Sequence, residues 1–138
     1  MAIDPIMVEI TFAALYCWRE DRSGNNAERL AQLSCIRNRV KAHWVPENKY
    51  QDVVCQPWQF SAMTAKGDPN LIKFPKSDDP NWIQILTLAE SIVVDMVPDS
   101  VGGACFYFSA PITEPPHAWG NVEKTVDIGA LHFYKSVR

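Results

Sequence analysis

A nearly unbroken apolar segment close to the N-terminus most restricts how this chain can fold. It covers residues 6–18 and directly follows Asp4 and Pro5. This pair is typical of a helix start, because Asp caps the first turn and Pro suits the first helical position. A helix that is apolar on nearly every side is expected to be buried in the protein centre. The segment therefore predicts a central helix that ends in the charged residues 19–24.

Two further segments have the periodicity of amphipathic helices. The first follows Asn25 and ends before Pro46, and the second follows Asp79 and ends before Pro98. In the first segment the apolar stripe is formed by Ala27, Leu30, Leu33, Ile36, Val40 and Trp44, and Arg29, Arg37, Arg39 and Lys41 occupy the other faces.

The rest of the chain contains weaker signals. A short helical turn is expected around residues 52–54, and a long loop over residues 61–80, where prolines and charges are frequent. Short extended runs are expected at residues 104–108 and 132–134. These patterns together predict an α+β fold that is mainly helical, with a small β region, in a single domain over residues 1–138.

Composition and charge exclude several classes of protein. Thirteen basic and sixteen acidic residues give a net charge of −3, so we expect no nucleic-acid partner. No apolar run approaches the roughly 18 residues of a spanning helix, so we expect no membrane insertion. Because no Lys or Arg precedes Arg19, the N-terminus does not resemble a secretory signal, and we expect synthesis in a cytoplasm.

The cysteines do not indicate a metal site or a redox motif. The four residues Cys17, Cys35, Cys55 and Cys105 include no C-x-x-C pair. Cys17 and Cys35 fall in apolar helical patterns, and Cys105 falls in an apolar strand. We therefore expect buried, reduced thiols.

Glu20 is the strongest candidate for catalysis. It lies where the apolar helix is expected to end, and partial burial of a carboxyl raises its pKa toward the range that general-acid chemistry needs. The neighbouring Arg19 and Arg22 are expected to lower that pKa. The three histidines, His43, His117 and His132, are isolated and lack the usual metal-ligand spacings, although they can still meet in space.

Four blocks of sequence, the first of which has two parts, together resemble the SleB-type (spore-cortex-lytic) cell-wall hydrolases. Residues 15–22 (LYCWREDR) and 35–40 (CIRNRV) resemble the family's Y-G-E-A-R-G-E and L-N-R-V, with the same eighteen-residue spacing from Glu to Asn. The later blocks are residues 56–61 (QPWQFS), 102–108 (GGACFYF) and 128–134 (IGALHFY), which are similar to Q-P-x-Q-F-S, G-G-A-x-Y-F-Y and I-G-x-H-x-F-Y.

The resemblance implies a lysozyme-like fold in which a single catalytic Glu ends the first long helix. By position this residue is Glu20. The substrate-binding residues implied beside it are Gln59 and Ser61, as hydrogen-bonding groups, and Trp58, Phe60 and Tyr107, as walls of a sugar groove. The implied substrate is the glycan strand of peptidoglycan, and the implied activity is that of a lysozyme or a lytic transglycosylase. No cofactor or metal is expected, and we expect a monomer.

The chain also departs from the family pattern. Arg19 replaces the Gly before the Glu, Gly24 replaces the second Glu, and Leu131 replaces the closing His, with His132 one place later. Because no second acid is evident, we expect a lytic transglycosylase rather than a hydrolase. Asp68, Asp78 and Asp79, in the long loop, are candidates for a missing second acid.

Three biological and chemical alternatives stay open. We expect a phage endolysin that acts on the cell wall after release, although a lysin carried by the virion fits equally well. A zinc-dependent amidase or peptidase on the same wall is a second possibility. The third is a non-catalytic glycan-binding or virion structural protein on a lysozyme-like scaffold.

Overall fold

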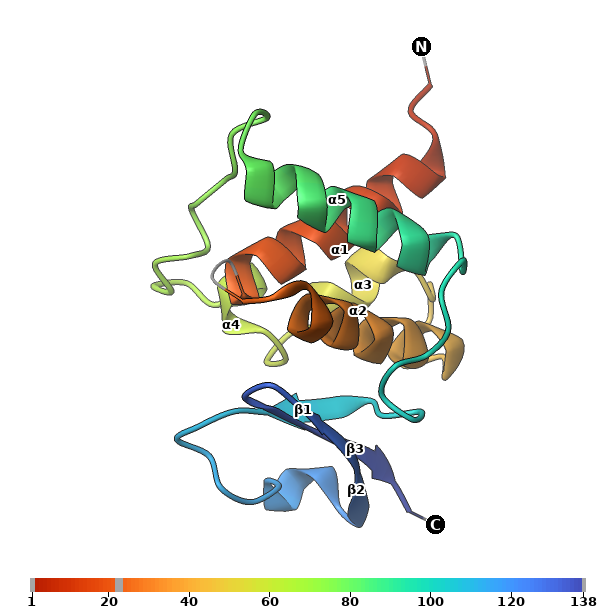
Figure 1. Ribbon diagram of the computed structural model, residues 1–138, viewed down its shortest axis with the longest axis vertical. Coiled ribbons are helices and arrows are strands. Elements are labelled where there is room, and N and C mark those ends of the chain that lie inside the picture. The colour runs from red at the N-terminus through yellow and green to blue at the C-terminus, as the bar shows by residue number, and fades with distance from the viewer. Residues whose placement is uncertain (1, 22–23, 138) are drawn as a thin grey trace.

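In the part of the chain that the structure describes, five α-helices and a three-stranded sheet form two layers (Figure 1). The computed structural model describes residues 2–21 and 24–137. The helices are α1 (Pro5–Glu20), α2 (Asn26–Lys41), α3 (Tyr50–Val54), α4 (Ser61–Thr64) and α5 (Pro80–Val93); the strands are β1 (Phe106–Phe108), β2 (Val122–Ile128) and β3 (Leu131–Ser136), and η1 (His117–Trp119) is a 3₁₀ turn. None of the described helices is long and apolar enough to cross a bilayer.

Helix α1 begins and ends close to the positions expected from the sequence. The Asp4 carboxylate accepts the Ile6 N–H at 3.0 Å, and Pro5 occupies the first turn. From Ile10 onward most side chains of α1 are buried against α3 and α5. The expected burial on every side is wrong for the first turn, where Ile6 and Met7 are 41% and 54% exposed. That end of the helix extends beyond α5 (Figure 1).

Helix α2 lies between the other helices and the sheet (Figure 1). Leu33 and Ile36 belong to the helical core, whereas Ala31 and Cys35 belong to a smaller core under the sheet. The expectation of a single apolar stripe is therefore wrong, because opposite faces of α2 are both covered. The buried residues include Arg29, Arg37 and Arg39, each at most 4% exposed, while the Lys41 side chain is 58% exposed.

The remaining helices follow the sequence pattern with one exception. Helix α3 occupies the expected helical turn. Helix α5 begins after Asp79, whose carboxylate accepts the Asn81 N–H at 2.9 Å. The exception is α4, a four-residue helix inside the segment that was expected to be a loop throughout.

The sheet is antiparallel, with the strand order β1-β3-β2. Strand β1 covers the last three residues of the extended run expected at residues 104–108, and β3 includes the run expected at residues 132–134, whereas β2 was not predicted. Phe133 on the central strand is fully buried. Gly129 in the β2–β3 turn has a φ of 57°, and a side chain there would collide with Glu28 at the start of α2. The β2–β3 turn therefore lies close against the start of α2.

The four cysteines are free thiols, and their burial is uneven. Cys17 and Cys35 are fully buried, as expected. Cys55 and Cys105 are only half-buried, so the expectation of burial is wrong for these two. Burial raises the pKa of all four thiols, to about 12 at Cys35, which keeps them protonated at neutral pH.

Candidate active site

Glu20 is the last residue of α1 and lines a cavity of about 310 Å³. The far wall of this cavity comes from β1 and from the loop that follows it. The complete lining is Glu20, Gln59, Phe60, Ser61, Tyr107, Phe108, Ser109, Ala110, Pro111, Ile112 and Trp119. The structure thus brings Glu20 together with four of the five residues expected to bind substrate.

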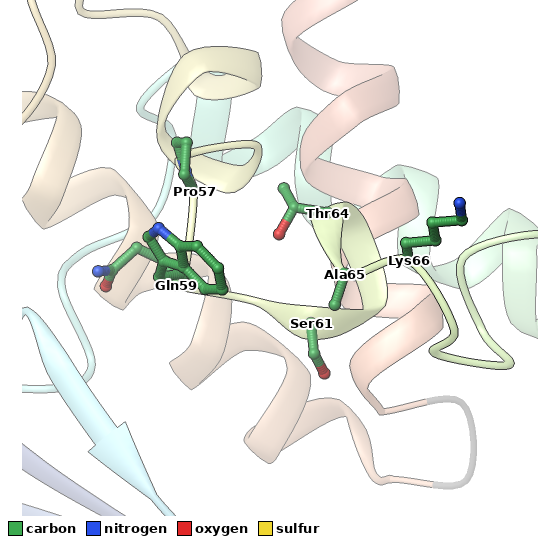
Figure 2. A pocket seen from close by; sticks show the side chains of 7 residues that line it. Pro57, Gln59, Ser61, Thr64, Ala65 and Lys66 are labelled. Carbon is green, nitrogen blue, oxygen red and sulfur yellow. The ribbon is translucent and has the colours of Figure 1, made fainter.

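Trp58, the fifth expected residue, does not line the cavity of Glu20. It is 97% exposed, with a φ of 69°, and it lines two adjoining hollows. One hollow, of about 530 Å³, is lined by Arg39, Trp44, Trp58, Gln59, Phe60, Phe106, Tyr107, Ala118 and Trp119. The other, of about 660 Å³, lies over α4 and the segment before it (Figure 2). Gln59 lines all three spaces, so they adjoin at this residue, and we refer to them together as the groove.

The Glu20 carboxyl is an acid suited to neutral pH. Residue 20 as a whole is exposed at the end of its helix, but its carboxyl group is largely withdrawn from solvent. Desolvation, followed by the negative charges of Asp68 and Asp21, raises the pKa of Glu20 to about 7. A carboxyl with this pKa can both donate and accept a proton near pH 7.

Arg19 does not counteract this shift, contrary to expectation. Its side chain is 6% exposed and turns toward the long loop, where Nε donates to the Lys73 carbonyl at 3.1 Å and Nη1 donates to the Ala62 carbonyl at 3.3 Å. The guanidinium also lies 4.8 Å from the centre of the Phe74 ring. Arg19 therefore fastens the loop to α1. Arg22, the other expected influence, lies outside the described residues.

Asp68 is the loop aspartate that interacts with Glu20. The Ser61 hydroxyl donates to Asp68 Oδ2 at 2.6 Å, and the Asn70 N–H donates to Oδ1 at 2.8 Å. These two hydrogen bonds lower the pKa of Asp68, so the carboxyl is ionised at neutral pH. Asp79, in contrast, is the N-cap of α5. Ser61 thus contacts both the cavity and the charge that influences Glu20.

Two tyrosines pack beneath Glu20. The hydroxyl groups of Tyr16 and Tyr107 lie 2.6 Å apart, and Tyr16 is fully buried. Tyr16 precedes Glu20 by one helical turn, so the two side chains share a face of α1. Burial raises the pKa of both phenols well above 10, with Glu20 as a further cause. Because its hydroxyl is paired with Tyr16, Tyr107 presents mainly its ring to the cavity.

The structure shows what surrounds two of the positions that depart from the family pattern, Gly24 and His132. A side chain at position 24 would collide with the Asp21 carboxyl, so a second acid does not fit there without rearrangement. His132 lies on β3 and pairs with Asp127 at 2.7 Å. Within residues 2–21 and 24–137, no three His, Cys, Asp or Glu side chains gather in an arrangement that would hold a metal ion.

Comparison with protein-family models places this chain among known cell-wall enzymes. The model described as Cell Wall Hydrolase matches residues 24–134, which is most of the sequence. The chain belongs to this family. The resemblance drawn from the four sequence blocks is thereby confirmed. The match begins four residues after Glu20, so it does not test the catalytic role expected of Glu20. The comparison with curated proteins finds no match.

The fold of this cell-wall hydrolase resembles that of a solved relative. The structure of the catalytic domain of the germination-specific lytic transglycosylase SleB from Bacillus anthracis superposes with a TM-score of 0.66. The two sequences are 22% identical, and the match covers 97% of this chain and 98% of the other. This likeness confirms the predicted fold class, which is mainly helical and lysozyme-like with a small β region.

The groove contains two residues that sequence reasoning did not select. Trp119, in η1, lines both the cavity of Glu20 and the 530 Å³ hollow. It follows the proline-rich residues 111–116, and no periodicity in the sequence marks it as a groove residue. Arg39 lines the 530 Å³ hollow although it is 4% exposed. The helical pattern placed Arg39 on a polar face. Its position in the L-N-R-V block was the only available signal.

Proposed function

We propose that this protein is a peptidoglycan lytic transglycosylase that cleaves between N-acetylmuramic acid and N-acetylglucosamine, with Glu20 as its single acid and base. The observation that carries the proposal is the Glu20 carboxyl, which opens into a groove and has a pKa of about 7. Membership of the cell wall hydrolase family and the activity named for the similar Bacillus anthracis domain support the substrate and the reaction.

The reaction needs one proton to move out and one to return. The Glu20 carboxylic acid donates its proton to the glycosidic oxygen, and the bond from that oxygen to C1 of the muramic residue breaks. The 6-hydroxyl oxygen of the same residue then bonds to C1, and its proton passes to the Glu20 carboxylate. The products are a free 4-hydroxyl and a 1,6-anhydro end. Because the nucleophile is already attached to the substrate, its attack benefits from proximity.

The side chains that line the groove favour a polysaccharide as the substrate. Trp58, Trp119 and Tyr107 offer aromatic surface for sugar rings, while Gln59 and Ser61 offer hydrogen-bonding groups. Asp68 keeps its negative charge near Glu20, and this charge adds to desolvation in raising the pKa of Glu20 to about 7.

Products released from purified sacculi test this proposal. We expect wild-type protein to release muropeptides with anhydro ends, which are lighter than reducing ends by one water. Glu20→Gln should remain folded and lose activity by at least 10²-fold, because general acid–base catalysis contributes about 10²–10⁴-fold. Glu90→Gln, an exposed carboxyl on α5, is the matched control and should retain full activity.

Other outcomes would overturn parts of the proposal. Reducing ends alone would make water the nucleophile and Asp68 the first candidate for a second carboxyl. Full activity of folded Glu20→Gln that is abolished by a chelator would indicate the zinc-dependent alternative. Retention of the protein on sacculi without any soluble product would indicate a non-catalytic glycan-binding protein.

We further propose that the protein lyses its host from inside, as a phage endolysin does. The proposed cleavage of peptidoglycan supports this role, since such an enzyme lyses a cell once it reaches the wall. Expression in bacteria should leave cells intact until the inner membrane is permeabilised, and lysis should follow at once. Lysis without permeabilisation would contradict this role.

A further inference from the structure

Gln59 occupies the point where the three parts of the groove meet. It lines the cavity of Glu20, the 530 Å³ aromatic hollow and the hollow over α4. Figure 2 shows its side chain extending away from Ser61, Thr64 and Lys66, toward the side of α2. A glycan strand that runs through the groove therefore has to pass Gln59.

Arg39 determines which end of the Gln59 amide faces the substrate. Arg39 Nη1 donates to Gln59 Oε1 at 3.2 Å. A guanidinium group has only donors, so its partner has to be the amide oxygen. The amide nitrogen Nε2 is consequently the end that remains for a ligand. Among the described residues, no hydrogen bond from Nε2 is formed.

Arg39 is itself held firmly. Its side chain is 4% exposed, and Nε donates to the Cys105 carbonyl at 2.7 Å. The guanidinium lies 4.3 Å from the centre of the Trp44 ring and 5.1 Å from that of the Phe60 ring. Because packing and hydrogen bonding both fix the guanidinium, Gln59 has a preorganised donor and not a freely rotating amide.

The surroundings of this donor fit an acetamide group. An N-acetyl group has one strong acceptor, its carbonyl oxygen, and one methyl group that prefers apolar contact. Trp119 and Tyr107 line both the cavity of Glu20 and the aromatic hollow, as Gln59 does, so aromatic surface is present in both of these spaces beside Gln59. Trp119 is kept in place by Phe106, whose ring centre lies 4.7 Å away.

We propose that Gln59 donates to the acetamide carbonyl of the amino sugar bound beside Glu20, and that Arg39 is the positioning residue for this donor. The inference rests on the proposed function and adds to it a determinant of specificity, namely the N-acetyl group. The enzyme then distinguishes acetylated from de-N-acetylated glycan through one hydrogen bond.

Activity on two matched substrates tests the inference. Sacculi are compared before and after de-N-acetylation, with chemically re-acetylated sacculi as the substrate control. Wild-type protein should lose about 3- to 10-fold in kcat/KM on the de-N-acetylated substrate, the usual effect of one neutral hydrogen bond. Gln59→Met should show a similar loss on acetylated sacculi and a preference ratio near one. Gln84→Met, the same change at an exposed site on α5, should keep the wild-type ratio.

Arg39→Lys tests the positioning role. This variant keeps the charge but lacks the planar fork, so Gln59 is free to rotate and the acetyl preference should fall toward one. A purely structural loss would lower activity on both substrates equally and leave the ratio unchanged. An unchanged ratio in folded Gln59→Met would overturn the inference.

Binding separates this inference from the proposed reaction. Tryptophan fluorescence of Glu20→Gln should report tighter binding of tetra-N-acetylchitotetraose than of its de-N-acetylated form, and Glu20→Gln/Gln59→Met should lose that preference. If wild-type protein does not cleave sacculi but shows the preference, the proposed function fails and the inference stands. If it cleaves but the preference survives in Gln59→Met, the inference fails alone. Equal binding of both tetrasaccharides by Glu20→Gln also overturns it.

Discussion

Glu20 combines access to the groove with a raised pKa because of its position at the end of a buried helix. The preceding turn of α1 is packed in the core, whereas the carboxyl borders the cavity. Desolvation therefore has the largest effect on its pKa, and the charge of Asp68 adds to it. The surroundings of Glu20 in the protein therefore raise its pKa before any substrate binds.

The pH dependence of kcat/KM should report this carboxyl. Glu20 has to be protonated to begin the reaction, so activity should fall as the pH rises through about 7. Asp68→Asn should move this alkaline limb to lower pH, because the substitution removes a negative charge that raises the pKa of Glu20. Asp78→Asn, an exposed neighbour in the same loop, is the control and should leave the limb in place. A loss of at least 10²-fold in kcat without such a shift would instead make Asp68 a reacting group.

The raised pKa of Glu20 also predicts a lower free energy of unfolding at high pH than at low pH. Between pH about 4.5 and about 7 the folded state holds a proton on Glu20 that the unfolded chain has released, so stability falls as the pH rises through this range. Glu20→Gln should therefore raise the Tm at pH 8 by about 4 °C, which corresponds to about 1 kcal/mol once partial hydration of the carboxyl is allowed for. At pH 4 the two proteins should melt together. Equal Tm values at both pH values would show that the carboxyl is not desolvated.

At the scale of elements, the helix starts could be predicted because their signals are local. Asp4, Asn25 and Asp79 each accept a backbone N–H in the first turn of the helix that follows. Strand β2 was missed because it lies at the sheet edge, alternates imperfectly in burial and contains a register shift after Lys124. Its sequence, VEKTVDI, contains three charged residues and no continuous apolar face.

The candidate site could be predicted from the sequence only in part, because only its local signals can be read along one segment. Glu20 could be inferred from the end of a strongly apolar helix. Trp119 reaches the groove from the 3₁₀ turn η1, and Arg39 reaches it from a helix face that is polar by pattern. Asp68, in the long loop, contacts the groove residue Ser61. Their positions depend on which elements pack on which, and periodicity along one segment carries no such information.

Asp79 is the N-cap of α5, so a substitution there tests whether this aspartate has a structural role or is the missing second acid. Asp79→Ala should reduce the free energy of unfolding by about 1 kcal/mol, because the Asn81 N–H loses its acceptor. The loss is measurable by urea denaturation, with Asp78→Ala as the neighbouring control. Activity per folded molecule should not change. A fall in kcat with unchanged stability would instead place Asp79 in the reaction.

On the scale of the whole molecule, the cavity of Glu20 lies where the two layers meet. Glu20 and Ser61 come from the helical layer, whereas Tyr107 and Trp119 come from the sheet and its loops (Figure 1). Helix α2 contributes to both hydrophobic cores, Leu33 and Ile36 to one and Ala31 and Cys35 to the other. If the two layers separated, one face of α2 would become exposed and the cavity of Glu20 would be lost at the same time.

This arrangement predicts that the chain unfolds in one cooperative step. Phe133→Ala in the core under the sheet and Ile85→Ala in the helical core remove fully buried side chains, so each should cost about 2–5 kcal/mol. Both variants should move the same transition, with far-UV circular dichroism and tryptophan fluorescence giving coincident curves. If Phe133→Ala instead separates a fluorescence transition, reported by Trp119, from a later loss of helix, the layers are independent. Arg39 on α2 makes that outcome unfavourable, because its Nε donates to the Cys105 carbonyl beside β1, and separation of the layers would break this buried hydrogen bond.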